Sequence, residues 1–294
     1  MFPKVPDQHK IGEPLVPNGL GVIYVLFATV YLFLIYFSGI TQSSNSVSAP
    51  LTLAVCILFG GFMGLLDDWM DLKWRYKAFM PLIAALPLIY LTLANPLTRT
   101  SISLPLIGVI ELGDAYYFLV IPLIVMIVTN TVNQLGGLNG LETVCPAIIL
   151  VGLMVLSQFS YLILMVGPLI LWIALAALNV KGKIFVGNIG SFAIGMTIAS
   201  FAVITDLKSS LLISILPYIF NSSLILLTVL FFRKRASVSL DGKKLVSDQR
   251  RSLVTLITYR RPMTERKVVA LISLIVAIFV SIAVLIELPW PLLT

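Results

Sequence analysis

Long apolar stretches separated by short polar segments dominate the pattern of this chain. A helix needs roughly 17–25 residues to cross a bilayer core of ~30 Å, and nine stretches reach or approach that length. Apart from Glu142 at one edge, none contains Asp, Glu, Lys or Arg. The stretches are 19–40, 50–66, 78–97, 116–134, 141–158, 160–178, 190–205, 209–232 and 268–286. The pattern predicts an all-α, polytopic membrane protein with about nine transmembrane helices.

The polar segments between these stretches carry the information about function. Four loops stand out, at 67–77, 133–142, 181–191 and 233–267, together with the N-terminal segment 4–21. Counting the crossings between them predicts that all five lie on one side of the membrane. The segment 98–115 falls on the other side, and its alternating β-branched residues predict a short outer β-hairpin. Within the last loop, the stretch 250–261 is interpreted as an interfacial helix.

Composition and charge support the membrane assignment and orient the chain. Hydrophobic residues make up 59% of the sequence and charged residues 11%, whereas about 25% of the residues in a soluble domain are charged. With a cytosolic N-terminus, 18 of the 20 basic residues lie inside, and only Arg99 and Lys208 fall outside. Topology therefore explains the net charge of +7 and argues against a nucleic-acid partner. Without repeats or breaks in composition, residues 1–294 are expected to form a single membrane-embedded domain.

The loop at 67–77 combines three carboxylates with three cations. Asp67, Asp68 and Asp71 can share only part of one helical face, because consecutive positions are turned by about 100°. One interpretation is a solvated cap between two helices. The other is that the acids position Mg²⁺ or a phosphate while Lys77 holds a lipid phosphate near the headgroups. The loop by itself leaves both interpretations open.

Two further loops combine amide side chains with glycines. Asn130 and Asn133 lie three residues apart at the end of an apolar stretch, where they are either helix caps or ligands. Phe185 and Asn188 belong to the sequence FVGNIGS directly before a helix, where free backbone N–H groups favour an anion. That spacing alone is weakly specific. The basic cluster at 233–235 is explained by membrane anchoring when it is read in isolation.

Taken together, these segments resemble the polyprenyl-phosphate N-acetylhexosamine-1-phosphate transferase family. The likeness covers nearly the whole chain, and the order of the motifs makes it specific. The motifs are VPNGLGVI at 16–23, LLDDWMDLKWRYK at 65–77, TNTVNQLGGLNGLE at 129–142, FVGNIGSFAIGM at 185–196, RKR at 233–235 and RPMTER at 261–266. The resemblance implies transfer of a sugar-1-phosphate from UDP-N-acetylglucosamine to dolichyl or another polyprenyl phosphate, with Mg²⁺ as cofactor and UMP as second product.

The resemblance also implies roles for individual residues. The implied catalytic residues are Asp67 and Asp68, which match paired acids near the metal and the acceptor, and Lys77, which matches the lysine that holds the carrier phosphate. The implied metal ligands are Asn133 and Asn188. The implied substrate-binding residues are Leu20, Gly21, Val22, Asn130, Asn139, Phe185, Arg233, Lys234 and Arg235. The basic loop 233–267 is expected to recognise the sugar diphosphate, and the active site is expected to face the cytosol.

Two departures from the family pattern keep an alternative function open. The family usually has an aspartate where this chain has Asn188, so the metal is expected to be held without that charge. The family also usually has ten spanning helices, one of them before residues 16–23. The alternative is a catalytically impaired member or a non-catalytic membrane partner. A MurNAc-pentapeptide transferase is disfavoured because the chain has a single histidine, and a transporter because the apolar stretches lack ionisable residues.

Elementary phosphate chemistry constrains the expected mechanism. A phosphomonoester has a second pKa of about 6, so the lipid phosphate is mostly a dianion at pH 7 and needs no obligatory general base. The difficulty is the meeting of two anions, which Mg²⁺ and basic side chains relieve. The resemblance implies the endoplasmic reticulum membrane, or the plasma membrane in an archaeal cell, and is compatible with a homodimer.

Overall fold

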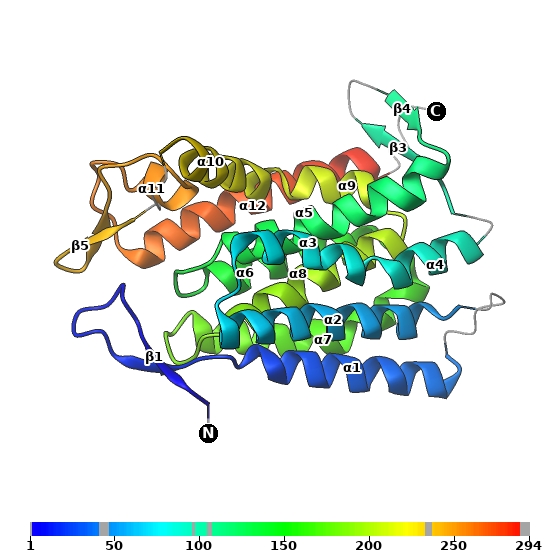
Figure 1. The fold of residues 1–294 in the computed structure, drawn as a ribbon, viewed down its shortest axis with the longest axis horizontal. Coiled ribbons are helices and arrows are strands. Elements are labelled where there is room, and N and C mark those ends of the chain that lie inside the picture. The colour runs from blue at the N-terminus through cyan, green and yellow to red at the C-terminus, as the bar shows by residue number, and fades with distance from the viewer. Residues whose placement is uncertain (1, 41–46, 96–97, 105–107, 233–236, 289–294) are drawn as a thin grey trace.

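The computed structural model describes residues 2–40, 47–95, 98–104, 108–232 and 237–288. Most of these residues lie in helices that run roughly side by side as one bundle (Figure 1). The first half contains α1 (Gly21–Ser38), α2 (Ala49–Met70), α3 (Trp74–Ala84), α4 (Leu86–Ala94), the π-helix η1 (Tyr116–Val120) and α5 (Ile121–Gln134). The second half contains α6 (Leu141–Leu156), α7 (Phe159–Asn179), α8 (Gly187–Ile204), α9 (Lys208–Ser214), α10 (Leu216–Phe232), α11 (Leu253–Ile257) and α12 (Glu265–Glu287).

The helices agree in outline with the predicted membrane spans. Each of the nine apolar stretches contains helix. Among the described residues, seven spans are long and apolar enough to cross a membrane, with α3 and α4 counted together, and likewise η1 and α5. The stretch 209–232 is divided into α9 and α10, which meet at an angle of 55° and form an eighth candidate. The stretch 141–158 forms α6, which has only 16 residues. By length and composition, the chain is a multi-pass helical membrane protein.

The described residues include three short antiparallel hairpins, which lie at the two ends of this bundle (Figure 1). At one end are β1 (Lys4–Pro6) with β2 (Leu15–Pro17), and β5 (Ser239–Asp241) with β6 (Lys244–Val246). At the other end is β3 (Ser101–Leu104) with β4 (Gly108–Glu111). The hairpin predicted within 98–115 is therefore confirmed.

The stretch 250–261 contains less helix than predicted, since only the five residues of α11 are helical. The backbone N–H of Leu253 donates to Asn221 Oδ1 of α10 at 2.9 Å. Ser247, which precedes α11, forms a β-bridge with Tyr259, which follows it. The prediction of a helix over 250–261 is wrong in its extent, because the residues after α11 form backbone hydrogen bonds with Ser247 instead of continuing the helix.

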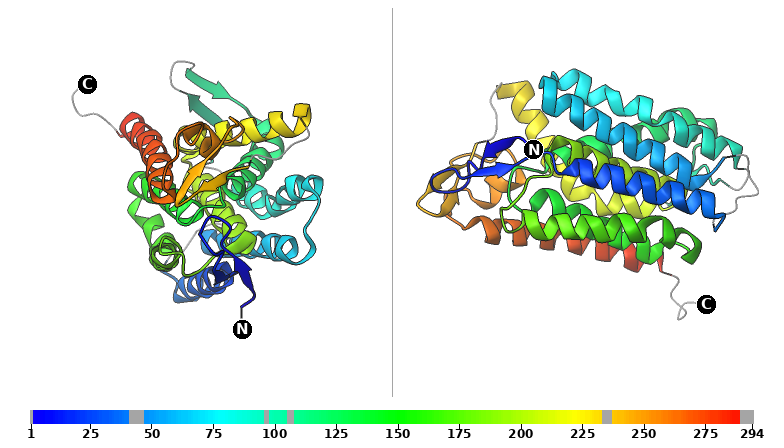
Figure 2. Two further views of the ribbon diagram at one scale, coloured as in Figure 1. Left: turned by 90° about the vertical axis from the view of Figure 1, so that its left-hand side faces the viewer. Right: turned by 90° about the horizontal axis from the view of Figure 1, so that it is seen from below.

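The central helix of the bundle is α8, which is surrounded by α1, α2, α5 and α6 (Figure 2). Every residue of α8 from Ile189 to Val203 is buried. Glycines allow neighbouring helices to approach it closely, as small residues do in membrane proteins. A Cβ atom on Gly64 of α2 would lie 2.3 Å from the carbonyl oxygen of Asn188. The end of α2 is therefore packed directly against the beginning of α8.

This contact gives a first prediction. Gly64→Ala is expected to force α2 and α8 apart and to lower stability by about 1–3 kcal/mol, because the methyl group meets backbone that cannot rotate away. Thermal unfolding of the purified protein in detergent measures the effect. Leu65→Ala is the matched control, since Leu65 is the next residue on α2 and is 49% exposed. Equal melting temperatures for Gly64→Ala and the unmodified chain would contradict the prediction.

Candidate active site

The turn between α2 and α3 brings an acid and a lysine together. Asp71 ends α2 in the left-handed conformation, with φ of 46°, so the chain reverses at that residue. This reversal places Lys77 of α3 beside the end of α2, and its Nζ lies 2.6 Å from Asp67 Oδ1. Asp67 is only 3% exposed, and its Oδ2 has no hydrogen-bond partner among the described residues. The turn therefore holds a buried carboxylate that is neutralised on one oxygen and unsatisfied on the other.

The second acid, Asp68, bridges α2 to the beginning of α8. Its Oδ1 accepts a hydrogen bond from the backbone N–H of Asn188 at 3.2 Å, and its Oδ2 accepts one from Ile189 at 3.1 Å. A carboxylate at this position satisfies two free N–H groups of the helix and interacts favourably with its dipole. A side chain on Gly187 would collide with this carboxylate, since a Cβ there would lie 2.9 Å from Asp68 Oδ2. The glycine is required by this close approach and by its φ of +71°.

The two predicted metal ligands are in direct contact. The Nδ2 of Asn133, at the end of α5, donates hydrogen bonds to Asn188 Oδ1 and to Ser191 Oγ, each at 2.8 Å. Together with the carboxylates of Asp67 and Asp68, these amides form a set of oxygen donors at one end of the bundle. The described residues contain no group of three or more His, Cys, Asp or Glu side chains that could enclose a metal. A donor set of this kind suits Mg²⁺, which typically binds one or two carboxylates and completes its shell with water and substrate phosphates.

An open cavity of about 740 Å³ lies beside Lys77. It is lined by the consecutive residues 71–77, which supply the cations of Lys73, Arg75 and Lys77 together with two aromatic side chains. The cations suit an anionic group, and the aromatic rings suit the interfacial region of a membrane. The geometry of this turn therefore fits a lipid phosphate.

The N-terminal hairpin joins the loop that contains Phe185. The backbone N–H of Phe185 donates to Pro17 O at 2.8 Å, and its carbonyl accepts from Leu20 N at 3.1 Å. The backbone N–H of Gly21 donates to Val186 O at 3.0 Å. Three predicted substrate-binding residues are thus brought together by backbone hydrogen bonds.

The same hairpin also holds Asn139 in the loop between α5 and α6. The Nδ2 of Asn139 donates to Asp7 Oδ2, and its backbone N–H donates to Glu265 Oε1, both at 2.7 Å. Lys10 forms an ion pair with the same glutamate. Asn139 is 6% exposed, and its Oδ1 has no hydrogen-bond partner among the described residues. Sequence reasoning missed Asp7 and Glu265. No local pattern marks Asp7, and Glu265 belongs to the motif RPMTER, which gave it no role of its own.

Asn179 is a third residue that sequence reasoning missed. It is fully buried at the end of α7, and its Oδ1 accepts hydrogen bonds from Gly140 N at 2.8 Å and Thr143 Oγ1 at 3.0 Å. Its Nδ2 donates to Ile184 O at 2.9 Å and to Glu142 Oε1 at 3.3 Å. One asparagine thereby fixes both loops of the site to each other. The available signal was an asparagine directly after the apolar stretch 160–178.

The remaining predicted site residues lie outside this hydrogen-bonded cluster. Asn130 Nδ2 donates to Met126 O at 2.8 Å and to Ala78 O at 3.3 Å, which links α5 to α3. Val22 is half-buried and packs against the hydrophobic core. The predicted basic cluster of Arg233, Lys234 and Arg235 lies outside the described residues.

The arrangement defines a class, a multi-pass membrane protein with a polar, acid- and amide-rich site at one end of its helical bundle. Residues 50–206, more than half of the chain, match glycosyl transferase family 4. The chain therefore belongs to that family.

Three relatives illustrate the range of the similarity. A Saccharolobus solfataricus protein, provisionally named UDP-N-acetylglucosamine–dolichyl-phosphate N-acetylglucosaminephosphotransferase, is 28% identical over 96% of this chain and 87% of its own length. The Schizosaccharomyces pombe protein of the same name is 23% identical over 74% of this chain and 59% of its own length. A phospho-N-acetylmuramoyl-pentapeptide-transferase from Streptococcus agalactiae is 26% identical over 81% of this chain and 74% of its own length.

Proposed function

We propose that this protein transfers N-acetylglucosamine-1-phosphate from UDP-N-acetylglucosamine to dolichyl phosphate or a related polyprenyl phosphate. The observation that carries the proposal is the clustering of the Asp67–Lys77 ion pair, the Asp68 bridge and the Asn133–Asn188 pair at one end of an apolar bundle. A phosphate on a membrane lipid can reach such a position, whereas its chain remains in the bilayer. The names of the archaeal and fungal relatives support the same donor and acceptor.

In the proposed reaction, Lys77 holds the phosphate of the lipid acceptor beside the turn between α2 and α3. An oxygen of that phosphate attacks the β-phosphorus of the nucleotide sugar and forms the new P–O bond. The bond between the β-phosphorus and the bridging oxygen breaks, and UMP leaves with that oxygen. Because the attacking group is already a dianion at pH 7, Asp67 and Asp68 serve to orient Lys77 and α8, and no proton has to be removed.

A Mg²⁺ ion would be held by Asn133 and Asn188, with Asp67 as the available carboxylate, because its Oδ2 accepts no hydrogen bond among the described residues. When bound, the ion supplies positive charge that offsets the repulsion between the two phosphates and stabilises the leaving group. The hydrogen bonds of the asparagine pair keep their amide groups at the end of α5 and the start of α8. We further propose that this end of the bundle faces the cytosol, in an endoplasmic reticulum or archaeal plasma membrane, because most basic residues belong to its loops.

A UMP-release assay tests the proposed function. Purified protein in detergent, supplied with dolichyl phosphate, is expected to release UMP from UDP-N-acetylglucosamine only when Mg²⁺ is present. Parallel reactions with UDP-glucose and UDP-N-acetylgalactosamine measure donor specificity. Binding of UDP-N-acetylglucosamine without any turnover would favour the alternative, a catalytically impaired member of the family.

The amide at position 188 gives a second prediction. Asn188→Asp is expected to lower the Mg²⁺ concentration for half-maximal UMP release by roughly tenfold, because a carboxylate holds a hard cation more tightly than an amide. A Mg²⁺ titration of the transfer rate measures the change. Gln158→Glu makes the same amide-to-acid exchange between α6 and α7 and should leave the titration unchanged. An unaltered curve for Asn188→Asp would remove Asn188 from the metal site.

A further inference from the structure

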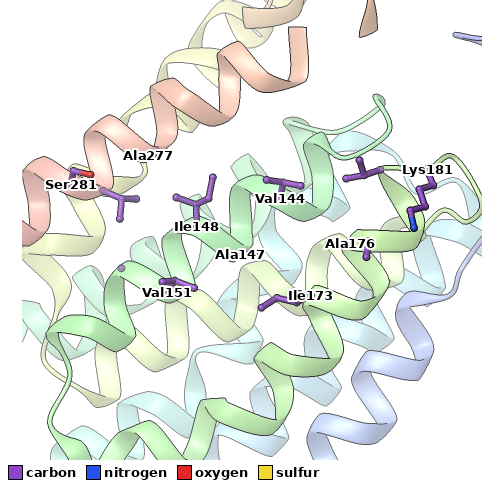
Figure 3. Close-up of a pocket in the computed structure, with 13 residues that line it drawn as sticks. Val144, Ala147, Ile148, Val151, Ile173, Ala176, Lys181, Ala277 and Ser281 are labelled. Atoms are coloured by element: carbon purple, nitrogen blue, oxygen red, sulfur yellow. The ribbon is translucent and has the colours of Figure 1, made fainter. Parts of the chain in front are cut away.

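A separate apolar cavity of about 620 Å³ lies between α6, α7 and α12 (Figure 3). Its walls include Val144 and Ile148 of α6, Ile173 of α7 and Ala277 of α12. Of the described residues that line it, Lys181 is the only charged one. Figure 3 shows Lys181 at one end of the cavity and Ser281 toward the other, so the cavity is apolar along its length and cationic at one end.

Close helix contacts close the cavity on its inner side. A Cβ atom on Gly152 of α6 would lie 2.2 Å from Val280 Cγ1 of α12, so these helices touch at that level. Near Lys181, a Cβ on Gly140 would lie 2.9 Å from Val180 Cγ2 and 3.4 Å from Val269 Cγ1. The cavity is therefore a groove that has a floor and opens to the outside of the bundle.

The cationic end of the groove lies at the same end of the bundle as the candidate active site. Lys181 follows α7 by two residues, and the last residue of α7, Asn179, is hydrogen-bonded to Gly140 at the beginning of α6. The groove itself is distant from Lys77, because α3 is on the opposite side of the bundle from α6, α7 and α12 (Figure 2). The groove is therefore separate from the cavity proposed for the acceptor phosphate.

We propose that the groove binds an anionic phospholipid, with an acyl chain between the helices and the headgroup phosphate at Lys181. An apolar groove that opens on the outside of a membrane bundle is filled by hydrocarbon, and basic residues between helix ends attract anionic headgroups. The flexible stem of lysine allows the ammonium group to follow a headgroup at the interface while its methylene groups cover apolar surface. The single charge at one end matches a lipid and not a second apolar helix, which would leave that charge without a counterpart.

Native mass spectrometry of the purified full chain tests this site. Phosphatidylglycerol and phosphatidylcholine with identical acyl chains are added at equal concentration. The protein is expected to bind the anionic lipid, phosphatidylglycerol, preferentially. Lys181→Gln is expected to weaken phosphatidylglycerol binding about fivefold, the factor that corresponds to one lysine near an anionic headgroup, and to leave phosphatidylcholine binding unchanged. Lys183→Gln is the matched control, because Lys183 is an exposed lysine of the same loop that does not line the groove.

A second variant tests the apolar part of the groove. Ala177 lines the groove and is exposed, so Ala177→Phe should fill the groove without overpacking the core and lower the binding of both lipids. Equal losses for Lys181→Gln and Lys183→Gln would overturn the assignment of the headgroup. Unchanged lipid binding by Ala177→Phe would overturn the groove as the site. Conversion of a dimer to a monomer by Ala177→Phe, with lipid binding retained, would instead assign the groove to contact between two copies of the chain.

Discussion

Lys77→Ala is expected to lower the rate of UMP release by roughly 10²–10³-fold while UDP-N-acetylglucosamine still binds. The structure gives two reasons. Lys77 is the cation at the turn that is paired with a buried acid, and it lines the open cavity proposed for the acceptor phosphate. Loss of its charge removes the attraction for the lipid phosphate and leaves the Asp67 carboxylate buried without a counterion. The family resemblance places the donor at the loops that contain Phe185 and Asn139, so its affinity should change little.

Rates of UMP release and calorimetric titration with the nucleotide sugar measure the two effects separately. Lys73→Ala is the matched control, since Lys73 lines the same cavity but is exposed and makes no ion pair with Asp67 among the described contacts. Lys77→Arg keeps the charge and should retain more activity than Lys77→Ala if the ion pair is needed mainly for its charge. Normal transfer by Lys77→Ala would falsify the role of the lysine.

The helices could be predicted because their signals are local. Runs without charged residues mark the spans, and alternation marks the hairpin within 98–115. The break between α9 and α10 also had a local signal, because Pro217 lacks an N–H group and its ring collides with the preceding turn. A count of apolar stretches overlooks that signal, because a proline inside a stretch does not divide it into two stretches.

Sequence patterns nominate the residues of the candidate site but do not predict the contacts between them. The order of the helices brings the polar loops to one end, which sequence patterns alone indicated. The contact between Asp68 and Asn188 joins positions 120 residues apart, and no periodicity in the sequence predicts it. The contact between Asp7 and Asn139, which are 132 residues apart, likewise has no signal in the sequence. Such pairs depend on the close approach of packed helices, as at Gly64, which only the three-dimensional structure supplies.

Asp68→Asn is expected to lower the transfer rate by roughly 10²-fold, the second large effect. The carboxylate accepts hydrogen bonds from two neighbouring N–H groups of α8, one on each oxygen. An amide has only one acceptor atom, so its NH₂ group would face the second N–H group, and the negative charge at the helix N-terminus is lost. Asn188 and Phe185 are then held less firmly, whereas loss of a single cap costs only about 1 kcal/mol of stability.

The difference between a large loss of rate and a small loss of stability distinguishes this role from a purely structural one. UMP release and thermal unfolding of the same preparation measure both quantities. Asp71→Asn is the matched control. Asp71 is fully exposed, its ion pair with Lys77 is long at 3.8 Å and contributes little, and its left-handed conformation accepts asparagine without strain. It should retain nearly full activity. If Asp68→Asn and Asp71→Asn lost activity equally, the loop would act through its total charge, and the hydrogen bonds from Asp68 to α8 would have no special part in the reaction.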